Sequence, residues 1–245
     1  MTRAGIIAAG DGTRLQKSHP GQVKPMLAIA GRPLCHWVAG ALSSAGVGEI
    51  TMLLNSRGGA AIPSLKSAFP GLSWNFLEKD TASSWESFRL IARELARKSG
   101  SFLISTVDAL VDPKDLALFI RAAAESPCEA ALGLTDFIDD EKPLWAELEA
   151  DGKISRLGPS VQKKKWATSG LYFIGAGVAE AMPAAGNYAS LREYWIGLAE
   201  SGVGILGVPL AKTVDVDRPE DLREAEIFIK ERTLKSPDNH GGVGW

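Results

Sequence analysis

Residues 4–33 read AGIIAAGDGTRLQKSHPGQVKPMLAIAGRP, and this stretch decides the fold. Its first six residues are small or β-branched and apolar, which is typical of a central strand covered on both faces of a sheet. Residues 10–13 (GDGT) then form a turn in which two glycines let backbone N–H groups line a concave site for anionic oxygens. Arg14 and Lys24 follow as cations suited to a polyphosphate. We therefore predict a triphosphate site at the end of the first strand.

The chain up to residue 134 continues as alternating helices and strands. Apolar residues recur at helical spacing over 34–45, where Gly46 ends the run. Further strands are predicted over 49–54, 74–78, 102–106 and 130–134, and further helices over 62–69, from a cap within 81–84 to 99, and over 113–125. This alternation is typical of a mainly parallel sheet. We expect an α/β fold with a Rossmann-like, mainly parallel (mixed) sheet flanked by helices.

The second half of the chain has a different pattern. Residues 145–150 and 153–157 are joined by Asp151-Gly152, which predicts an antiparallel hairpin. Strands are also predicted over 171–174 and 204–208, and helices over 188–201 and 219–232. Residues 234–245 are rich in Gly, Pro, Asp and Asn and are expected to be a disordered tail. We expect one domain over 1–233, in which the N-terminal half binds a nucleotide and roughly residues 135–215 receive a second substrate.

Composition and charge exclude several classes of function. The 27 basic and 29 acidic residues give a net charge of −2, and the one basic run is 163–165, which argues against an extended nucleic-acid surface. Cys35 and Cys128 match no disulfide framework or metal pair, which favours a reducing cytoplasm. No apolar run approaches about 18 residues, and residues 1–3 lead directly into the first strand without the pattern of a signal peptide. We expect a cytoplasmic protein without a membrane partner.

Two standard nucleotide-binding motifs fail when they are tested on this sequence. A dinucleotide-binding fingerprint needs a third Gly or Ala near position 15, where Leu15 stands, and an acid after the second strand, where Asn55 stands. The P-loop needs Gly-Lys-Ser/Thr, and residues 12–14 read Gly-Thr-Arg. The predicted phosphate loop is therefore of another kind.

AAGDGTRL at 8–15 followed by VKPMLAIAGRPL at 23–34 resembles the signature of the nucleotidyltransferase family, which comprises sugar-1-phosphate nucleotidyltransferases and related cytidylyltransferases. Many members have Pro before the Lys, and Val23 stands there instead, which leaves Lys24 in register. The resemblance implies a fold of the nucleotide-diphospho-sugar transferase type and an NTP held by the Gly-rich loop, with Arg14 and Lys24 as catalytic cations. The implied nucleotide contacts in this loop are Ala8, Ala9, Gly10, Gly12 and Thr13.

The same resemblance implies a magnesium site. Asp108, in STVDAL, matches the Asp that binds Mg²⁺ after the fourth strand, although Val107 replaces the usual Gly. Asp112 is the better cap for the helix at 113–125, which frees Asp108 for catalysis and metal binding. VDVDRPED at 214–221 resembles the family's DxDxPEDL segment, where a carboxylate completes the metal site. Strand alternation directs Asp215 and Asp217 to one face, and we favour Asp217 as the ligand with Asp215 as its neighbour.

Two alternative roles concern acids in this segment. Asp217 could instead cap the following helix, a role that does not exclude metal binding. Glu220 and Asp221 are expected to be solvated acids of the first helical turn, favoured by the helix dipole.

Further resemblances suggest contacts to the base and to the acceptor. Residues 78–86 loosely resemble the family's base-reading segment, which implies nucleotide contacts from Glu78, Ser83 and Ser84. TSGLY at 168–172 is similar to the family's N-T-G-hydrophobic segment, which implies acceptor contacts from Thr168 and Gly170. Lys165 precedes it and could meet an acceptor phosphate, although a run of lysines is commonly a solvated face.

The implied reaction transfers NMP from an NTP to a sugar-1-phosphate, forms an NDP-sugar and releases pyrophosphate, with Mg²⁺ as cofactor. Because the attacking oxygen is already anionic, no general base is required. Two alternatives stay open: a cytidylyltransferase for a non-sugar phosphate such as phosphocholine or an inositol phosphate, and a nucleotide-binding regulatory module without turnover. An NTP and a phosphorylated small-molecule acceptor are the expected partners.

Overall fold

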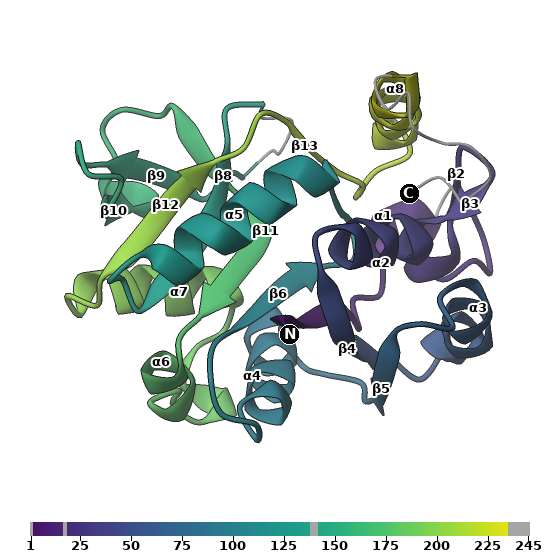
Figure 1. The fold of residues 1–245 in the computed structure, drawn as a ribbon, viewed down its shortest axis with the longest axis horizontal. Coiled ribbons are helices and arrows are strands. Elements are labelled where there is room, and N and C mark those ends of the chain that lie inside the picture. Colours follow the sequence, from purple (N-terminus) through teal and green to yellow (C-terminus); the bar gives the residue numbers. More distant parts are fainter. Residues whose placement is uncertain (1, 17–18, 138–141, 235–245) are drawn as a thin grey trace.

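The computed structural model describes residues 2–16, 19–137 and 142–234 (Figure 1). In this described part the strands are β1 (Thr2–Ala8), β2 (Ala28–Ile29), β3 (Arg32–Pro33), β4 (Val47–Leu54), β5 (Ser73–Glu78), β6 (Phe102–Thr106), β7 (Ala109–Val111), β8 (Ala130–Thr135), β9 (Trp145–Leu148), β10 (Ile154–Leu157), β11 (Trp166–Ile174), β12 (Ile205–Pro209) and β13 (Thr213–Asp215). The α-helices of the same part are α1 (Thr13–Gln16), α2 (Leu34–Ser44), α3 (Ala61–Ala68), α4 (Ser84–Leu95), α5 (Pro113–Glu125), α6 (Ala176–Glu180), α7 (Leu191–Glu200) and α8 (Asp221–Leu234).

Nine of the described strands form one mixed sheet with β1 near its middle. The order is β10-β9-β11-β6-β1-β4-β5, and β8 pairs with β11 on one side and β12 on the other. Strand β1 is parallel to both neighbours, with Ile7 opposite Thr106 of β6 and opposite Leu53 of β4. The N–H of Val107 extends this pairing by donating to Ile7 O at 3.0 Å. The carboxyl ends of β1 and β6 therefore lie side by side, and the loops that follow them share one edge of the sheet.

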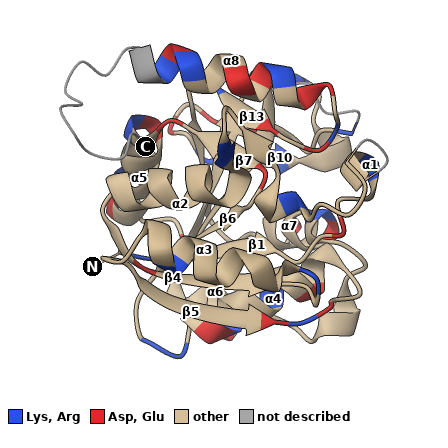
Figure 2. Ribbon diagram, turned by 90° about the vertical axis from the view of Figure 1, so that its right-hand side faces the viewer, with Lys and Arg blue, Asp and Glu red and all other residues tan. Residues whose placement is uncertain are grey.

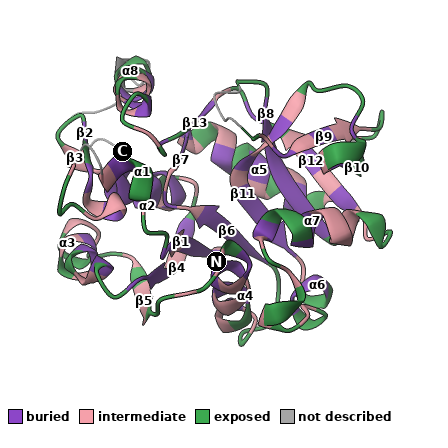
Figure 3. Ribbon diagram, turned by 180° about the vertical axis from the view of Figure 1, so that it is seen from behind, coloured by how far each residue is buried: buried purple, intermediate pink, exposed green. Residues whose placement is uncertain are grey.

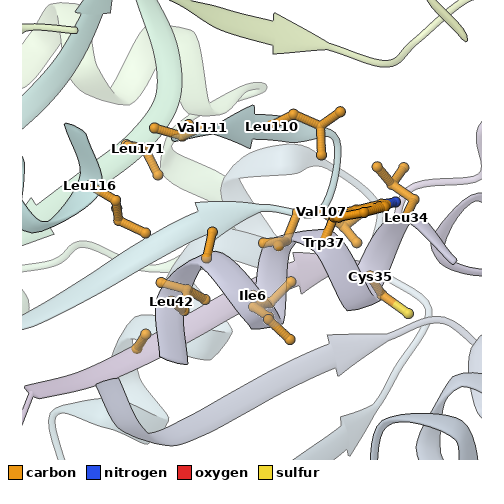
Figure 4. Packing of buried hydrophobic residues seen from close by; sticks show 14 of the residues in the cluster. Ile6, Leu34, Cys35, Trp37, Leu42, Val107, Leu110, Val111, Leu116 and Leu171 are labelled. Carbon is orange, nitrogen blue, oxygen red and sulfur yellow. The ribbon is translucent and has the colours of Figure 1, made fainter. Parts of the chain in front are cut away.

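Helices cover both faces of the sheet. Helices α2, α3 and α5 pack on one face, and α4, α6 and α7 pack on the other. The buried strands lie between these helical layers (Figure 3). Side chains alternate along β1, so that Ile6 packs towards Leu42 on α2 (Figure 4) while Ile7 packs towards α4. Each apolar side chain of this size that is fully buried contributes about 1.5–3 kcal/mol, and both faces of β1 therefore stabilise its position.

Helix α4 illustrates how local sequence fixes the elements around the site. Ser83 is its N-cap, and its hydroxyl accepts the N–H of Glu86 at 3.1 Å. The Glu86 carboxylate accepts the N–H of Ala82, the residue before the cap, at 2.8 Å, which further fixes the start of the helix. Trp85 and Phe88 on the inner face are fully buried. The predicted helix start within 81–84 is confirmed.

The C-terminal helix α8 packs on the α2 side of the core. Phe228 and Ile229 are buried there, and Arg232 forms an ion pair with Asp112, the cap of α5, at 2.8 Å. Basic and acidic residues alternate along α8 (Figure 2). The helix ends at Leu234, and the rest of the expected tail, residues 235–245, lies outside the described part.

The sheet differs from the simple alternation that the sequence suggests. Strand β8 does not follow β6 in the sheet, because the long antiparallel strand β11 lies between them. Strand β11 begins at Trp166, five residues before its predicted start, and α7 begins at Leu191 rather than Tyr188 because Ser190 caps it. The hairpin β9–β10 is confirmed. In the described residues, no helix is long and apolar enough to span a bilayer.

Candidate functional site

Three charged side chains from distant parts of the chain meet at the carboxyl edge of the sheet. The ammonium Nζ of Lys24 lies 2.6 Å from Oδ2 of Asp108 and also donates to Oδ1 of Asp217. The Lys24 side chain is 8% exposed, while that of Asp217 is 51% exposed. One buried cation thus joins a carboxylate that follows β6 to one that follows β13.

A short two-stranded ribbon brings the two carboxylates together. Strand β13 pairs antiparallel with β7, placing Asp215 opposite Ala109. The N–H of Val216 donates to Asp108 O at 3.2 Å, so the ribbon continues up to the two acids. Because Asp108 precedes β7 and Asp217 follows β13, both lie at the same end of the ribbon. The sequence analysis did not predict this ribbon, since three-residue strands carry little periodic signal.

The electrostatics of this cluster favour the charged forms of Lys24 and Asp108. Burial alone would lower the pKa of Lys24, but the negative charges of Asp108 and Asp217 outweigh it and raise that pKa above its usual value. Burial opposes ionisation of Asp108, yet Lys24 and a hydrogen bond from the Thr106 hydroxyl lower its pKa. Two carboxylates against one ammonium leave a net negative charge. The two carboxylates can therefore accept a further cation.

The predicted phosphate loop lies beside this cluster. A cleft is lined by Gly10, Gly12, Thr13 and Arg14 together with Lys24, Thr106, Asp108 and Asp217. Gly12 has φ +59°, and a Cβ there would lie 3.1 Å from Lys24 Cβ, so the loop needs glycine to pack on Lys24. Ala8 and Ala9 are buried under the loop and do not line this cleft. The structure thus brings the loop, Arg14 and the charged cluster together.

The residues predicted to contact the base are not among those that line the phosphate cleft. Glu78 ends β5 and is exposed. The Ser83 hydroxyl caps α4, and the Ser84 hydroxyl accepts the N–H of Leu191 at 3.0 Å. Both serine hydroxyls thus make hydrogen bonds within the fold, and Ser84 lines a second cavity rather than the phosphate cleft. One ion pair beside the loop was not predicted from the sequence. The Arg57 guanidinium lies 2.7 Å from the Asp11 carboxylate.

The second cavity shares Asp108 and Asp217 with the phosphate cleft. Thr168 and Gly170, which the sequence suggested as acceptor contacts, line it together with Asp215. Gly170 has φ +74°, and a Cβ there would lie 2.5 Å from the Thr106 hydroxyl, so only glycine fits. We call this the acceptor cavity. Its further lining residues are Ser84, Thr106, Leu144, Tyr172, Ser190, Leu191, Arg192 and Trp195.

The cations near the acceptor cavity are not where the sequence placed them. Lys165 lies over the ring of Trp166, 4.5 Å from its centroid, and is not among the residues that line the cavity. Arg192 lines it instead. The sequence did carry a signal for the position of Arg192, because Ser190 is a helix cap and Arg192 lies in the first turn that follows it.

Three of the four acids in the 214–221 segment have separate roles. Asp217 is the one that contacts Lys24, and Asp215 lines the acceptor cavity. The expectation that Asp221 is solvated is wrong, since it is 4% exposed. Its carboxylate accepts the N–H groups of Asp217 at 2.9 Å and Arg218 at 2.7 Å. Asp221, rather than Asp217, therefore caps this turn, and Asp217 keeps its carboxylate for the site.

The site and the fold define a nucleotide-binding α/β protein, with a Gly-rich loop, two cations and two carboxylates at the carboxyl edge of a mixed sheet. Residues 4–165 match the MobA-like NTP transferase domain, and the chain belongs to this family of nucleotidyltransferases.

Solved structures share the fold across nearly the whole chain. The inositol-1-phosphate CTP transferase from T. maritima has a TM-score of 0.78 at 19% identity, covering 94% of this chain and 97% of that one. A putative glucose-1-phosphate thymidylyltransferase from Bacillus anthracis has a TM-score of 0.78 at 18% identity, covering 99% of this chain and 98% of that one. At these identities the likeness concerns the fold, and the predicted fold class is confirmed.

A curated relative matches over a shorter stretch. The bifunctional enzyme IspD/IspF of Caulobacter vibrioides (strain NA1000 / CB15N) is 36% identical over 66 residues. The match covers 27% of this chain and 16% of the length of that enzyme.

Proposed function

We propose that this protein is a Mg²⁺-dependent nucleotidyltransferase that moves NMP from an NTP to a sugar-1-phosphate, forming an NDP-sugar and pyrophosphate. One observation carries the proposal: the phosphate cleft and the acceptor cavity meet at Asp108 and Asp217, which hold Lys24 between them. An NTP in the first space and an acceptor in the second would place their phosphates against the same charged cluster. Membership of an NTP transferase family supports this reading.

The reaction exchanges one phosphorus–oxygen bond for another. An anionic phosphate oxygen of the acceptor attacks the α-phosphorus, the bond from that phosphorus to the oxygen bridging to the β-phosphorus breaks, and pyrophosphate leaves with the electron pair. Because the nucleophile is already ionised, positioning and charge neutralisation supply the rate. The N–H groups of the loop at Gly10 and Gly12 cradle the phosphates, Thr13 adds a hydroxyl, and Arg14 and Lys24 neutralise the departing charge.

The two carboxylates fit a divalent cation. Asp108 and Asp217 both reach one cationic group, Lys24 Nζ, and their combined charge exceeds that of the ammonium. Carboxylate oxygens suit Mg²⁺, which is commonly held in phosphate-transfer sites by one or two carboxylates together with substrate phosphates. When bound, the metal supplies neutralisation of phosphate charge. Asp215 stands next to this pair on the acceptor side.

The sugar-1-phosphate is the proposed acceptor, with Thr168 and Gly170 beside it on the cavity wall. Non-sugar phosphates remain the rival, and the structural neighbours are named for both kinds, inositol-1-phosphate in one and glucose-1-phosphate in another. Glu78, which ends β5 and is exposed, is the proposed contact to the base.

The test is a matrix of ATP, CTP, GTP, UTP and dTTP against glucose 1-phosphate, inositol 1-phosphate and phosphocholine with Mg²⁺, with pyrophosphate as the readout. We expect turnover in at least one combination and its loss in Asp108→Asn. Asp151→Asn, in the exposed β9–β10 turn, is the matched control and should keep the activity. Nucleotide binding with no pyrophosphate in any combination would overturn the proposal and favour the regulatory module.

A further inference from the structure

The acceptor cavity has a strongly uneven distribution of charge. Three carboxylates line it: those of Asp108 and Asp217, which also line the phosphate cleft, and that of Asp215. Among the lining residues that the structure describes, the positively charged one is Arg192. Lys24 compensates one of the three negative charges, and the charge that is left repels a phosphorylated acceptor, so that a cation within the same cavity favours its binding.

Arg192 lies at the N-terminal end of α7. Ser190, Leu191 and Arg192 are consecutive and all line the cavity, so the first turn of this ten-residue helix faces it. The dipole of the helix favours an anion near this first turn. The N–H of Leu191 donates to Ser84 Oγ and that of Glu193 to Ser190 Oγ, which fixes the turn that carries Arg192.

The Arg192 guanidinium group has no ion-pair partner within residues 2–16, 19–137 and 142–234, which the structure describes. It donates to the backbone carbonyl of Lys142, in the segment that leads to Leu144 on the cavity wall. A phosphate accepts hydrogen bonds from guanidinium more strongly than a neutral carbonyl does, because both partners are charged and the contact can be bidentate. Arg192 is also exposed, so this exchange of partner needs no rearrangement of the core.

The pKa of Tyr172 is affected both by Arg192 and by two of the acids. Burial raises the pKa of the Tyr172 hydroxyl, the charges of Asp215 and Asp108 raise it further, and the charge of Arg192 opposes them. The hydroxyl on the cavity wall is therefore within electrostatic range of the acids and of Arg192 together. Trp195 stacks on Tyr172 with the ring centroids 5.4 Å apart, and its buried indole N–H is a donor without an acceptor in the described residues.

We propose that Arg192, with the first turn of α7, binds the phosphate of the acceptor and determines that the protein takes phosphorylated rather than unphosphorylated acceptors. The assignment rests on the proposed function in calling the ligand an acceptor, while the anion site itself can be tested without turnover. It replaces Lys165 as the cation of the acceptor side, since Lys165 lies over Trp166 outside the cavity.

The test compares Arg192→Ala and Arg192→Lys with Lys165→Ala and with Arg121→Ala, an exposed position on α5 that serves as the matched charge control. Binding of glucose 1-phosphate, inositol 1-phosphate, phosphocholine and inorganic phosphate is measured by calorimetry without NTP. With any acceptor that turns over, KM is measured separately for acceptor and NTP. Thermal unfolding confirms that each variant is folded.

We expect Arg192→Ala to weaken phosphate-containing probes and to raise acceptor KM by about tenfold or more, because a charge-assisted contact is lost. Arg192→Lys should recover part of the loss, and the KM for NTP should stay within about twofold. Lys165→Ala and Arg121→Ala should bind as the wild type does. Unphosphorylated glucose should not distinguish the wild type from Arg192→Ala.

The assignment is overturned if Arg192→Ala binds all phosphate probes as the wild type does, if Lys165→Ala causes the larger loss, or if the wild type binds none of the probes. Probe binding that depends on Arg192 together with no pyrophosphate from any acceptor would support the anion site and contradict the proposed reaction. The two proposals can therefore fail separately.

Discussion

The carboxylate of Asp221 accepts a hydrogen bond from the backbone N–H of Asp217, with 2.9 Å between the two heavy atoms. It also accepts the N–H of Arg218 and pairs with the Arg218 guanidinium at 3.2 Å. The backbone that carries one of the two site carboxylates is thus held by a buried acid that lines no part of the phosphate cleft.

Asp221→Ala is expected to lower kcat by about 10- to 100-fold, because residues that orient a metal-binding carboxylate have effects of this size. It should also cost about 1–3 kcal/mol of unfolding free energy, since buried donors lose their acceptor. Pyrophosphate release as a function of Mg²⁺ concentration separates the two effects, and a positioning role predicts a higher Mg²⁺ requirement. Glu220→Ala, one residue away and exposed, is the control. Equal kinetics in the two variants would contradict this role.

Lys24→Met is expected to destabilise the protein by about 1–3 kcal/mol when divalent cations are chelated, since Asp108 and Asp217 lose the cation between them. Added MgCl₂ should stabilise this variant more than the wild type, because the metal can replace the missing positive charge. Thermal unfolding in EDTA and in MgCl₂ measures both changes. Lys230→Met removes an exposed pair on α8 and should change little. The prediction is wrong if Lys24→Met unfolds in EDTA at the wild-type temperature.

Gly170→Ala should abolish use of the acceptor. Its added Cβ would lie 2.5 Å from the Thr106 hydroxyl, and the backbone has φ +74°, so strain of about 1–3 kcal/mol is expected. Because Thr106 also donates to Asp108, the displacement reaches the charged cluster. Gly71→Ala, with open space around the new Cβ, is the control and should leave turnover and stability near the wild type. Turnover assays and urea unfolding decide the outcome.

His36 predicts a dependence of stability on pH away from the active site. Burial, and then the charge of Arg32, lower the pKa of His36 below its ordinary value of 6.5, and its ring bonds to the Ser64 hydroxyl at 2.8 Å. The folded protein therefore binds the proton less well than the unfolded chain. The contribution to stability is complete above pH 6.5 and is lost as the pH falls below that value.

Urea unfolding of the wild type and of His36→Gln at several values between pH 7.5 and 5 measures this dependence. The stability difference between the two should shrink towards acid pH, since the glutamine does not titrate. Equal slopes of stability against pH in both proteins would show that His36 does not carry the effect.

The sequence predicted the elements with strong local signals. Helix α5 has the predicted bounds, because Asp112 caps it and Pro113 occupies the first position. Lys24, Asp108 and Asp217 were expected in one site and lie in contact. By contrast, the early start of β11 depends on its pairing with β8 and β9. No local sequence pattern indicates this pairing. The burial of Asp221 and the entry of Arg192 into the acceptor cavity likewise depend on packing between segments far apart in the chain.

The β7–β13 ribbon has a consequence for when the site can exist during synthesis. The phosphate loop and Asp108 leave the ribosome early, but Lys24 gains its second carboxylate only once residue 217 has emerged and β13 has paired with β7. A nascent or truncated chain that stops at residue 165, where the family match ends, contains the nucleotide loop with half of its acidic pair. The final third of the chain thus contributes a carboxylate to the charged cluster. A domain boundary drawn at the end of the match would separate Asp217 from Lys24 and Asp108.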